Sequence, residues 1–75
     1  MTEAELIDLA AGVFGISSAD VKLDTTPNDL PQWDSLNHLH LITAFESRVG
    51  VRLSMQQIQS IAVLGDFLAL QHSGG

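Results

Sequence analysis

The sequence predicts a small all-α fold, and three features of the 75-residue chain carry this prediction. Apolar residues recur every three to four positions over most of its length, which is the period of helices that pack on a core. Glycines and capping residues mark where the helices begin and end. No alternation of apolar and polar residues is long enough for a β-strand. We therefore expect a four-helix bundle with a long loop between the first two helices and a short third helix.

The first helix is predicted over about residues 3–14. Thr2 and Glu5 have the spacing of a capping box, in which each side chain caps the backbone of the other residue. Apolar residues then follow at helical spacing at positions Leu6, Ile7, Ala10, Val13 and Phe14. Gly15 can adopt the left-handed conformation that commonly ends a helix.

A long loop is predicted between the first two helices, over residues 16–33. This stretch holds Pro27 and Pro31 among Ser, Asn and Asp residues that favour turns, and its apolar residues are scattered. Loops of this length are uncommon in compact domains unless they serve a function. Here the loop delivers the chain to the start of the second helix.

The second helix is predicted from Asp34 to Val49. Its apolar stripe consists of Leu39, Ile42, Phe45 and Val49, with Leu41 at the edge. At ~100° per residue, Leu36 lies about 120° from the centre of that stripe, so we expect an exposed Leu36. Gly50 then provides a second glycine stop.

Two shorter helices should complete the domain. Ser54 and Gln57 form another capping-box pattern, which predicts a third helix of about two turns. A fourth is predicted over residues 64–71, although Val63 stands where a capping Ser or Thr is common. We expect residues 71–75 to form a flexible tail, and the whole chain, residues 1–75, to be a single domain.

The composition excludes several classes of protein. The chain has no cysteine, so it has neither disulfides nor a thiolate nucleophile of its own. Its net charge of −6 opposes binding to nucleic acid or to anionic lipid. No apolar run approaches the roughly 20 residues that span a bilayer, and the acidic start does not look like a secretory signal. We expect a cytoplasmic monomer with no membrane span.

The negative charge is concentrated in the first half of the chain. Seven acidic residues and one lysine lie in residues 1–34, whereas two acidic residues and two arginines follow from Ser35 onward. The second helix is therefore predicted to present a nearly neutral surface.

Asp34 and Ser35 form the motif with the clearest chemical meaning. Asp34 suits the N-cap position, which places Ser35 in the first helical turn beside unpaired backbone N–H groups and the positive end of the helix dipole. A phosphate attached to Ser35 would be stabilised there. An Asp-Ser-Leu tripeptide on its own, however, more commonly does no more than cap a helix.

The arrangement as a whole resembles the acyl carrier proteins over about residues 6–70. The resemblance rests on Trp33-Asp34-Ser35-Leu36 at the start of the second helix, on Val49-Gly50-Val51 at its end, and on Leu64-Gly65-Asp66. It implies that a separate phosphopantetheinyl transferase attaches 4′-phosphopantetheine from coenzyme A to Ser35. The thiol of this arm would then carry acyl groups as thioesters, and in this family the acyl chain can enter between helices two and three.

The same resemblance implies a non-catalytic carrier that serves fatty-acid-like or polyketide-like biosynthesis. Its partners would be the transferase, an acyl-loading enzyme (an acyltransferase or an adenylating ligase) and downstream synthase or transferase enzymes. Many carriers of fatty-acid synthesis are acidic along helix two, where this chain has Asn37 and His40. Residues 30–36 look most like discrete carriers of specialised polyketide-like pathways. We expect partner contacts at Asp34, Leu36, His40 and Glu46.

The sequence offers three alternatives to the carrier interpretation: a metal site, a helical interaction module and a ubiquitin-like modifier. His38 and His40 lie about 200° apart around a helix, at ~100° per residue, so they cannot ligate one metal ion and we expect no metal site. His38 is interpreted instead as a residue of the capping turn. A helical interaction module with an unmodified Ser35 remains open. Gly74-Gly75 also resembles the end of ubiquitin-like modifiers, but a β-grasp fold needs several strands.

Overall fold

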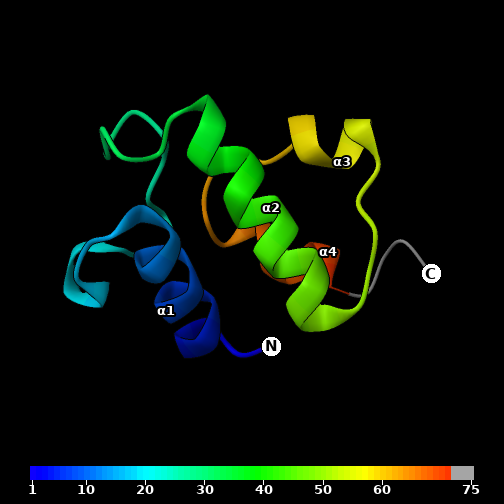
Figure 1. The fold of residues 1–75 in the computed structure, drawn as a ribbon, viewed down its shortest axis with the longest axis horizontal. Coiled ribbons are helices and arrows are strands. Elements are labelled where there is room, and N and C mark those ends of the chain that lie inside the picture. Colours follow the sequence, from blue (N-terminus) through cyan, green and yellow to red (C-terminus); the bar gives the residue numbers. More distant parts are fainter. Residues whose placement is uncertain (72–75) are drawn as a thin grey trace.

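The computed structural model of the chain describes residues 1–71, which fold as four α-helices and contain no β-strand (Figure 1). Helices α1 (Glu3–Phe14) and α2 (Ser35–Val49) are long, whereas α3 (Met55–Gln59) and α4 (Asp66–Leu70) have five residues each. The all-α prediction is therefore confirmed. Because α3 and α4 are so short, the fold is described as compact and helical rather than as a regular four-helix bundle.

Both ends of α1 have the predicted geometry. The Glu5 N–H donates to Thr2 Oγ1 over 3.1 Å, and the Thr2 N–H donates to Glu5 Oε1 over 2.8 Å, which completes the capping box. Gly15 ends the helix with a φ of 71°, and Gly50 ends α2 with a φ of 73°. Residues other than glycine rarely adopt this left-handed backbone conformation, which explains why α1 and α2 each stop at a glycine.

The buried side of α2 differs from the predicted stripe. Leu41, Ile42 and Phe45 are buried as the core-facing residues of the helix, whereas Leu39 is 56% exposed. The prediction that Leu39 belongs to the core is wrong. Apolar residues occupy more than half of the circumference of α2, so periodicity alone left its orientation open, and packing against α1 decided it. Leu36 is 62% exposed, as expected.

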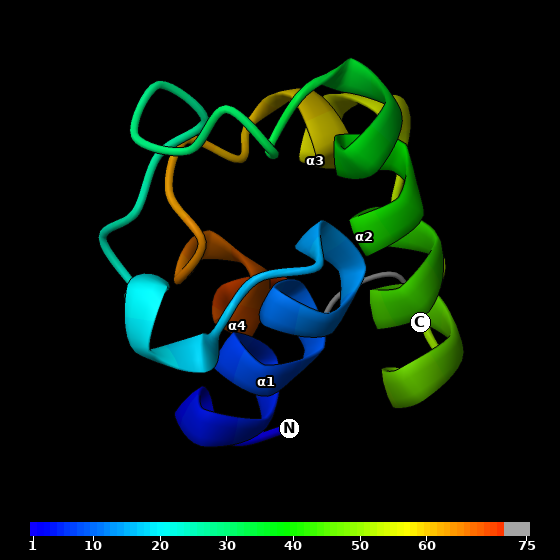
Figure 2. The same cartoon turned by 60° about the vertical axis from the view of Figure 1, so that its left-hand side comes forward.

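The core is built mainly between α1, α2 and α4. Five side chains are almost fully enclosed: Phe45, Phe67, Leu6, Leu41 and Leu64. The Phe45 and Phe67 rings lie 5.0 Å apart with a tilted geometry, which joins the middle of α2 to α4. Figure 2 shows α4 behind α1, while α3 lies beside the N-terminal half of α2 in both views.

The predicted loop over residues 16–33 contains a short 3₁₀ helix, η1 (Ser18–Asp20), that the sequence analysis did not predict. The loop is attached to the start of α4 by two backbone hydrogen bonds. The Leu64 N–H donates to the Thr25 carbonyl over 3.0 Å, and the Gly65 N–H donates to the Leu23 carbonyl over 2.8 Å. A β-carbon at Gly65 would lie 3.2 Å from that Leu23 oxygen, so glycine permits this close approach.

The start of α4 is two residues later than predicted. The backbone N–H groups of residues 64 and 65 are bonded to the long loop, and the Asp66 carboxylate accepts hydrogen bonds from the Ala62 and Val63 N–H groups. These acceptors satisfy N–H groups that precede α4 and hold the start of the helix against the long loop. The predicted capping box of Ser54 and Gln57 is present at α3, which is shorter than the two turns expected.

The predicted tail of residues 71–75 lies mostly outside the described residues. Gln71, the one member that is described, is half-buried, and its Oε1 accepts a 2.7 Å hydrogen bond from the amino group of Met1. None of the helices in residues 1–71 has the length and apolarity needed to cross a membrane.

Candidate functional site

Ser35 is the first residue of α2 and its side chain is exposed. The turn that precedes it is held by two hydrogen bonds around Asn37. The Asn37 N–H donates to Asp34 Oδ1 over 2.9 Å, and Asn37 Nδ2 donates to the Gln32 carbonyl over 2.7 Å. Asp34 is therefore the N-cap that the sequence predicted, and Ser35 is held in a defined position on the surface.

The electrostatic environment of Ser35 favours an anion. The N–H groups of Ser35 and Leu36 have no hydrogen-bond partner within residues 1–71, and the first turn of α2 carries no acidic residue. Unpaired N–H groups and the helix dipole place partial positive charge at this end of a 15-residue helix. A phosphodiester on Ser35 Oγ would meet that charge.

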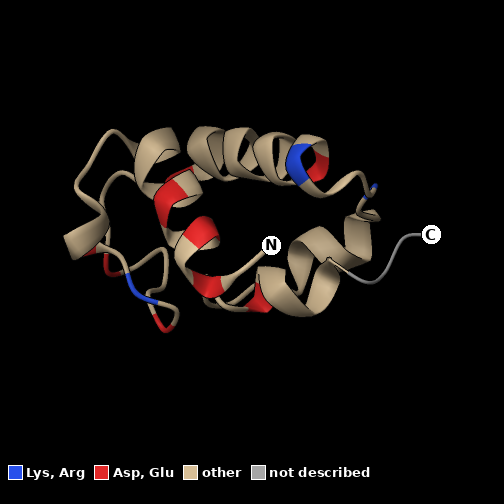
Figure 3. Cartoon of the chain, turned by 90° about the horizontal axis from the view of Figure 1, so that it is seen from below, with Lys and Arg blue, Asp and Glu red and all other residues tan. Residues whose placement is uncertain are grey.

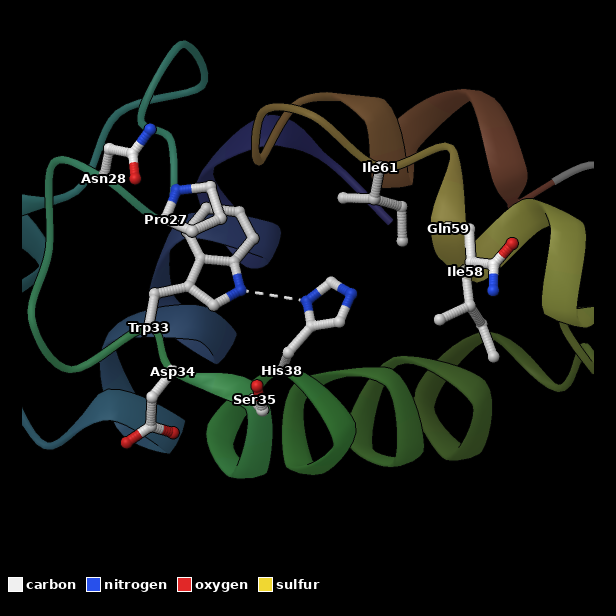
Figure 4. Close-up of a pocket in the computed structure, with 9 residues that line it drawn as sticks. All are labelled: Pro27, Asn28, Trp33, Asp34, Ser35, His38, Ile58, Gln59 and Ile61. Carbon is white, nitrogen blue, oxygen red and sulfur yellow. Dashed lines mark hydrogen bonds between the residues drawn. The ribbon is translucent and has the colours of Figure 1, made fainter.

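A hollow of about 500 Å³ opens beside Ser35, between α2, the long loop and α3 (Figure 4). Ser35 and Asp34 lie at one side of the hollow, and the apolar side chains of Ile58 and Ile61 lie across it. The full lining is Pro27, Asn28, Trp33, Asp34, Ser35, His38, Ile58, Gln59 and Ile61. The hollow is thus lined by both apolar and polar side chains.

Trp33 and His38 form the wall of the hollow between the loop and α2. Trp33 is only 3% exposed, and its ring lies 5.6 Å from the ring of Phe14. The indole Nε1–H donates a 2.9 Å hydrogen bond to His38 Nδ1, drawn as the dashed line in Figure 4. His38 is half-buried in this wall, and its backbone N–H donates to the carbonyl of the N-cap residue Asp34 over 2.8 Å, so it also belongs to the first turn of α2.

A signal for His38 was present in the sequence. His38 lies three and four residues before Leu41 and Ile42, so it shares the buried side of α2 with them. A polar residue at the end of an apolar stripe indicates contact with a partly buried site. The signal was missed because the stripe was centred too close to Leu39.

The four residues expected to contact partners have different surroundings. Asp34, Leu36 and His40 are exposed on α2 or at its N-cap. Glu46 is half-buried near the opposite end of the helix, where its Oε2 accepts a 2.8 Å hydrogen bond from the Leu53 N–H. Glu46 therefore supports the connection to α3, a structural role that the sequence analysis did not predict.

Charged side chains are sparse on α2. Figure 3 shows the helix without charge over most of its length, with Glu46 and Arg48 near its C-terminal end, while acidic residues lie along α1. Glu46 and Arg48 are the charged residues of the helix itself, and their charges cancel. Leu36, Leu39 and the α3 residue Met55 are the exposed large apolar side chains of the described chain.

The Ser35 hydroxyl makes no hydrogen bond to another side chain within residues 1–71, whereas an activated serine needs an adjacent base. Nor do three or more His, Cys, Asp or Glu side chains gather where they could hold a metal ion in that part of the chain. The arrangement can accept a phosphate on an exposed hydroxyl and shelter an apolar group beside it.

Comparison with known proteins does not identify the chain: no family model matches it, and no curated protein matches it.

Proposed function

We propose that the protein is an acyl carrier protein that holds acyl intermediates as thioesters on a 4′-phosphopantetheine arm attached to Ser35. The observation that carries the proposal is the position of Ser35. It is an exposed hydroxyl at the N-terminus of α2, and it lines a hollow that also includes the apolar side chains of Ile58 and Ile61. The N-terminus of α2 would stabilise an attached phosphate, and the apolar side chains of the hollow would contact an attached chain.

The attachment reaction requires a separate phosphopantetheinyl transferase. Ser35 Oγ attacks the phosphorus that bears the pantetheine in coenzyme A, and a phosphodiester bond forms to serine. The pyrophosphate linkage breaks, adenosine 3′,5′-bisphosphate leaves, and the serine proton passes to a base on the transferase. The absence of a hydrogen-bonded base at Ser35 within residues 1–71 fits a chain that is modified by another enzyme.

The arm supplies the thiol that this cysteine-free chain lacks. An acyltransferase or an adenylating ligase would load the acyl group, and synthase or transferase enzymes would consume it in fatty-acid-like or polyketide-like biosynthesis. In this proposal the four helices act as a compact carrier bundle in the cytoplasm, where the single domain works as a monomer. Asp34, Leu36 and His40 lie on the exposed surface that partner enzymes would contact around Ser35.

The proposal is tested by the intact mass of the protein after incubation with coenzyme A and a broad-specificity phosphopantetheinyl transferase. We expect the mass to rise by one phosphopantetheine group and Ser35→Ala to remain unmodified. Ser47→Ala, at another exposed serine of α2, is the matched control and should be modified normally. An unmodified parent protein, or a modified Ser35→Ala variant, would contradict the assignment.

A second candidate function is a helical interaction module in which Ser35 stays unmodified. The exposed side chains of Leu36 and Leu39 favour it, because they lie three residues apart on α2 and neighbouring exposed apolar residues mark interaction surfaces. The mass measurement separates the two functions. The third alternative, a ubiquitin-like modifier, requires β-strands that residues 1–71 do not contain, and Gly74-Gly75 lies outside the described residues.

A further inference from the structure

The hydrogen bond between Trp33 and His38 determines where the proton of the neutral imidazole lies. An indole N–H can only donate, so His38 Nδ1 must present its lone pair to Trp33 Nε1 across their 2.9 Å contact. A neutral imidazole carries one proton, which therefore resides on Nε2. His38 is held as a hydrogen-bond donor at the nitrogen that faces away from Trp33.

That donor points into the hollow. In Figure 4 the second ring nitrogen of His38 is turned from Trp33 toward the space in front of Ile58 and Ile61. No hydrogen bond joins this nitrogen to any other group within residues 1–71. Within residues 1–71, Nδ1 of His38 is therefore paired with Trp33, whereas the Nε2–H of the same ring has no protein acceptor.

The other polar groups of the hollow are less suited to bind a ligand atom. Asn28 and Gln59 are exposed, so water competes for their amides, and the Asp34 carboxylate accepts the Asn37 N–H. His38 is half-buried between the indole of Trp33 and two isoleucines. A hydrogen bond formed beside apolar side chains is stronger than one formed in open water. Among the side chains compared, His38 Nε2–H is therefore the donor whose hydrogen bond gains most from apolar surroundings.

We propose that His38 Nε2–H binds a carbonyl oxygen of the group carried on Ser35, and that it makes His38 a specificity-determining residue of this carrier. The inference rests on the proposed function, because the ligand arrives through Ser35. His38 lies one helical turn after Ser35, on the side of α2 that lines the hollow. The oxygen can come from an amide of the arm, from the thioester or from an oxidised carbon of the cargo, and a fully saturated chain offers no acceptor beyond the thioester.

The direct test follows the imidazole of His38 by ¹⁵N NMR at neutral pH in four forms of the parent protein. These are the unmodified protein, the phosphopantetheine form, the hexanoyl form and the 3-oxohexanoyl form. In the form that supplies the acceptor, we expect the Nε2 proton to shift and its exchange with water to slow by about fivefold, which corresponds to one neutral hydrogen bond. The first form that responds identifies the oxygen as that of the arm, the thioester or the cargo.

Two substitutions separate the two nitrogens of the ring. In His38→Asn the side-chain amide occupies the position of Nδ1, so the variant can still accept the Trp33 hydrogen bond but has no donor in the hollow. In His38→Gln the side chain is longer and its amide occupies the position of Nε2, so the variant keeps the donor in the hollow and loses the acceptor for Trp33. With ¹³C-labelled carbonyl groups in the arm and the cargo, we expect His38→Asn to abolish the downfield shift that the hydrogen bond gives the bound carbonyl, and His38→Gln to retain it. Ser47→Asn, at an exposed position of the same helix that does not line the hollow, is the control.

The two proposals fail in distinguishable ways. If the transferase adds nothing to Ser35, both are wrong. If Ser35 is modified but the His38 ring signals are the same in all four forms, the carrier function stands and the inference about His38 is wrong. Circular dichroism of both His38 variants separates a loss of fold from a loss of the donor, and the NMR test on the parent does not depend on either variant.

Discussion

At the scale of single residues, the structure assigns definite positions to side chains whose surroundings the sequence left open. Phe45 is fully buried and contacts Phe67, whereas Leu39, six residues earlier on the same helix, is 56% exposed. Both are large apolar residues of the stripe predicted for α2. Their unequal burial therefore shows which side of α2 faces the core.

Replacing Phe45 should be severely destabilising. Phe45→Ala removes a fully buried ring and its contact with Phe67, which should lower the free energy of unfolding by about 3–5 kcal/mol. A domain of this size has a total stability near the low end of ~5–15 kcal/mol, so the variant should be largely unfolded at moderate temperature. Thermal unfolding followed by circular dichroism measures the loss.

Leu39→Ala is the matched control for this prediction. Its exposed side chain loses little burial, so the free energy of unfolding should change by less than about 0.5 kcal/mol. Equal losses for the two variants would contradict the orientation of α2 in the structure and would restore the stripe centred on Leu39.

At the scale of elements, side-chain hydrogen bonds cap the N-termini of α1, α2 and α3. The capping box at α1 couples helix stability to pH through Glu5. The backbone N–H of Thr2 lowers the pKa of the Glu5 carboxyl from its ordinary value of 4.5, and the Thr2 hydroxyl and the nearby Arg48 lower it further. Arg48 Nη2 lies 3.3 Å from Glu5 Oε2, and both side chains are about half exposed.

Glu5→Gln should remove a stabilisation that depends on pH. Because folding lowers this pKa, the ionised carboxylate stabilises the fold above about pH 4.5, and that stabilisation is lost as the pH falls through the folded value. Glutamine keeps an oxygen for the Thr2 N–H but has no charge. We expect the variant to melt below the parent at pH 7 and the two melting temperatures to converge in more acidic solution.

Glu3→Gln provides the comparison within the same helical turn. It removes a carboxylate near the helix N-terminus but no hydrogen bond to Thr2. We expect Glu3→Gln to change the melting temperature less than Glu5→Gln does, both measured against the parent. A difference between parent and Glu5→Gln that grows as the pH falls would have the wrong sign for a lowered pKa.

At the scale of the whole molecule, the charge distribution separates an acidic first half from a nearly neutral α2 (Figure 3). Charges at the rim of an interface mainly set the association rate and the choice of partner. Enzymes whose basic surfaces recognise an acidic second helix should therefore engage this protein slowly.

Adding acidic residues to α2 should raise the association rate with such an enzyme. His40→Glu combined with Ser47→Glu places two negative charges at exposed positions of the helix, and it leaves the Asn37 hydrogen bond to Gln32 intact. We expect faster acylation of the phosphopantetheine form by an acyltransferase with a basic docking surface. The gain should be about tenfold at low salt and should fall as salt rises.

A variant with two added negative charges outside α2 controls for a general attraction between an acidic protein and a basic enzyme. Ala4→Glu in α1 with Ala19→Glu in η1 adds two charges at exposed positions away from α2. Acylation rates should rise less in this variant. Equal rates for the parent and both double variants at low salt would show that charge on α2 does not select the partner.

Much of the fold was predictable because its signals are local. The bounds of α1, the N-cap at Asp34 and both glycine stops depend on residues within one helical turn of each other, where side-chain and backbone hydrogen bonds decide the conformation. The exposure of Leu36 followed from the helical period. Ser35 could be singled out for the same reason, since its setting is made by the turn that contains it.

Other features depend on contacts between segments distant in sequence. The segment before α4 is held by the N–H groups of Leu64 and Gly65, which bond to carbonyls some 40 residues earlier, and no local pattern announces these bonds. Glu46 was expected at a partner surface, and its bond to the Leu53 N–H was not anticipated. No local pattern reports such pairings, because each satisfies a backbone group only after the chain has folded.

The sequence by itself determined that this protein is helical, where its two long helices lie and which serine stands at the N-terminus of the second. Periodicity, caps and glycine stops act within a few residues and need no tertiary context. Only the tertiary structure decided which side of α2 is buried, because apolar residues cover more than one side of that helix. It also brought α3 across from Ser35 to form the hollow, and it turned the His38 donor toward Ile58 and Ile61. These properties depend on how the helices pack, and that packing is settled by the burial of Phe45, Phe67 and Leu41 in one core.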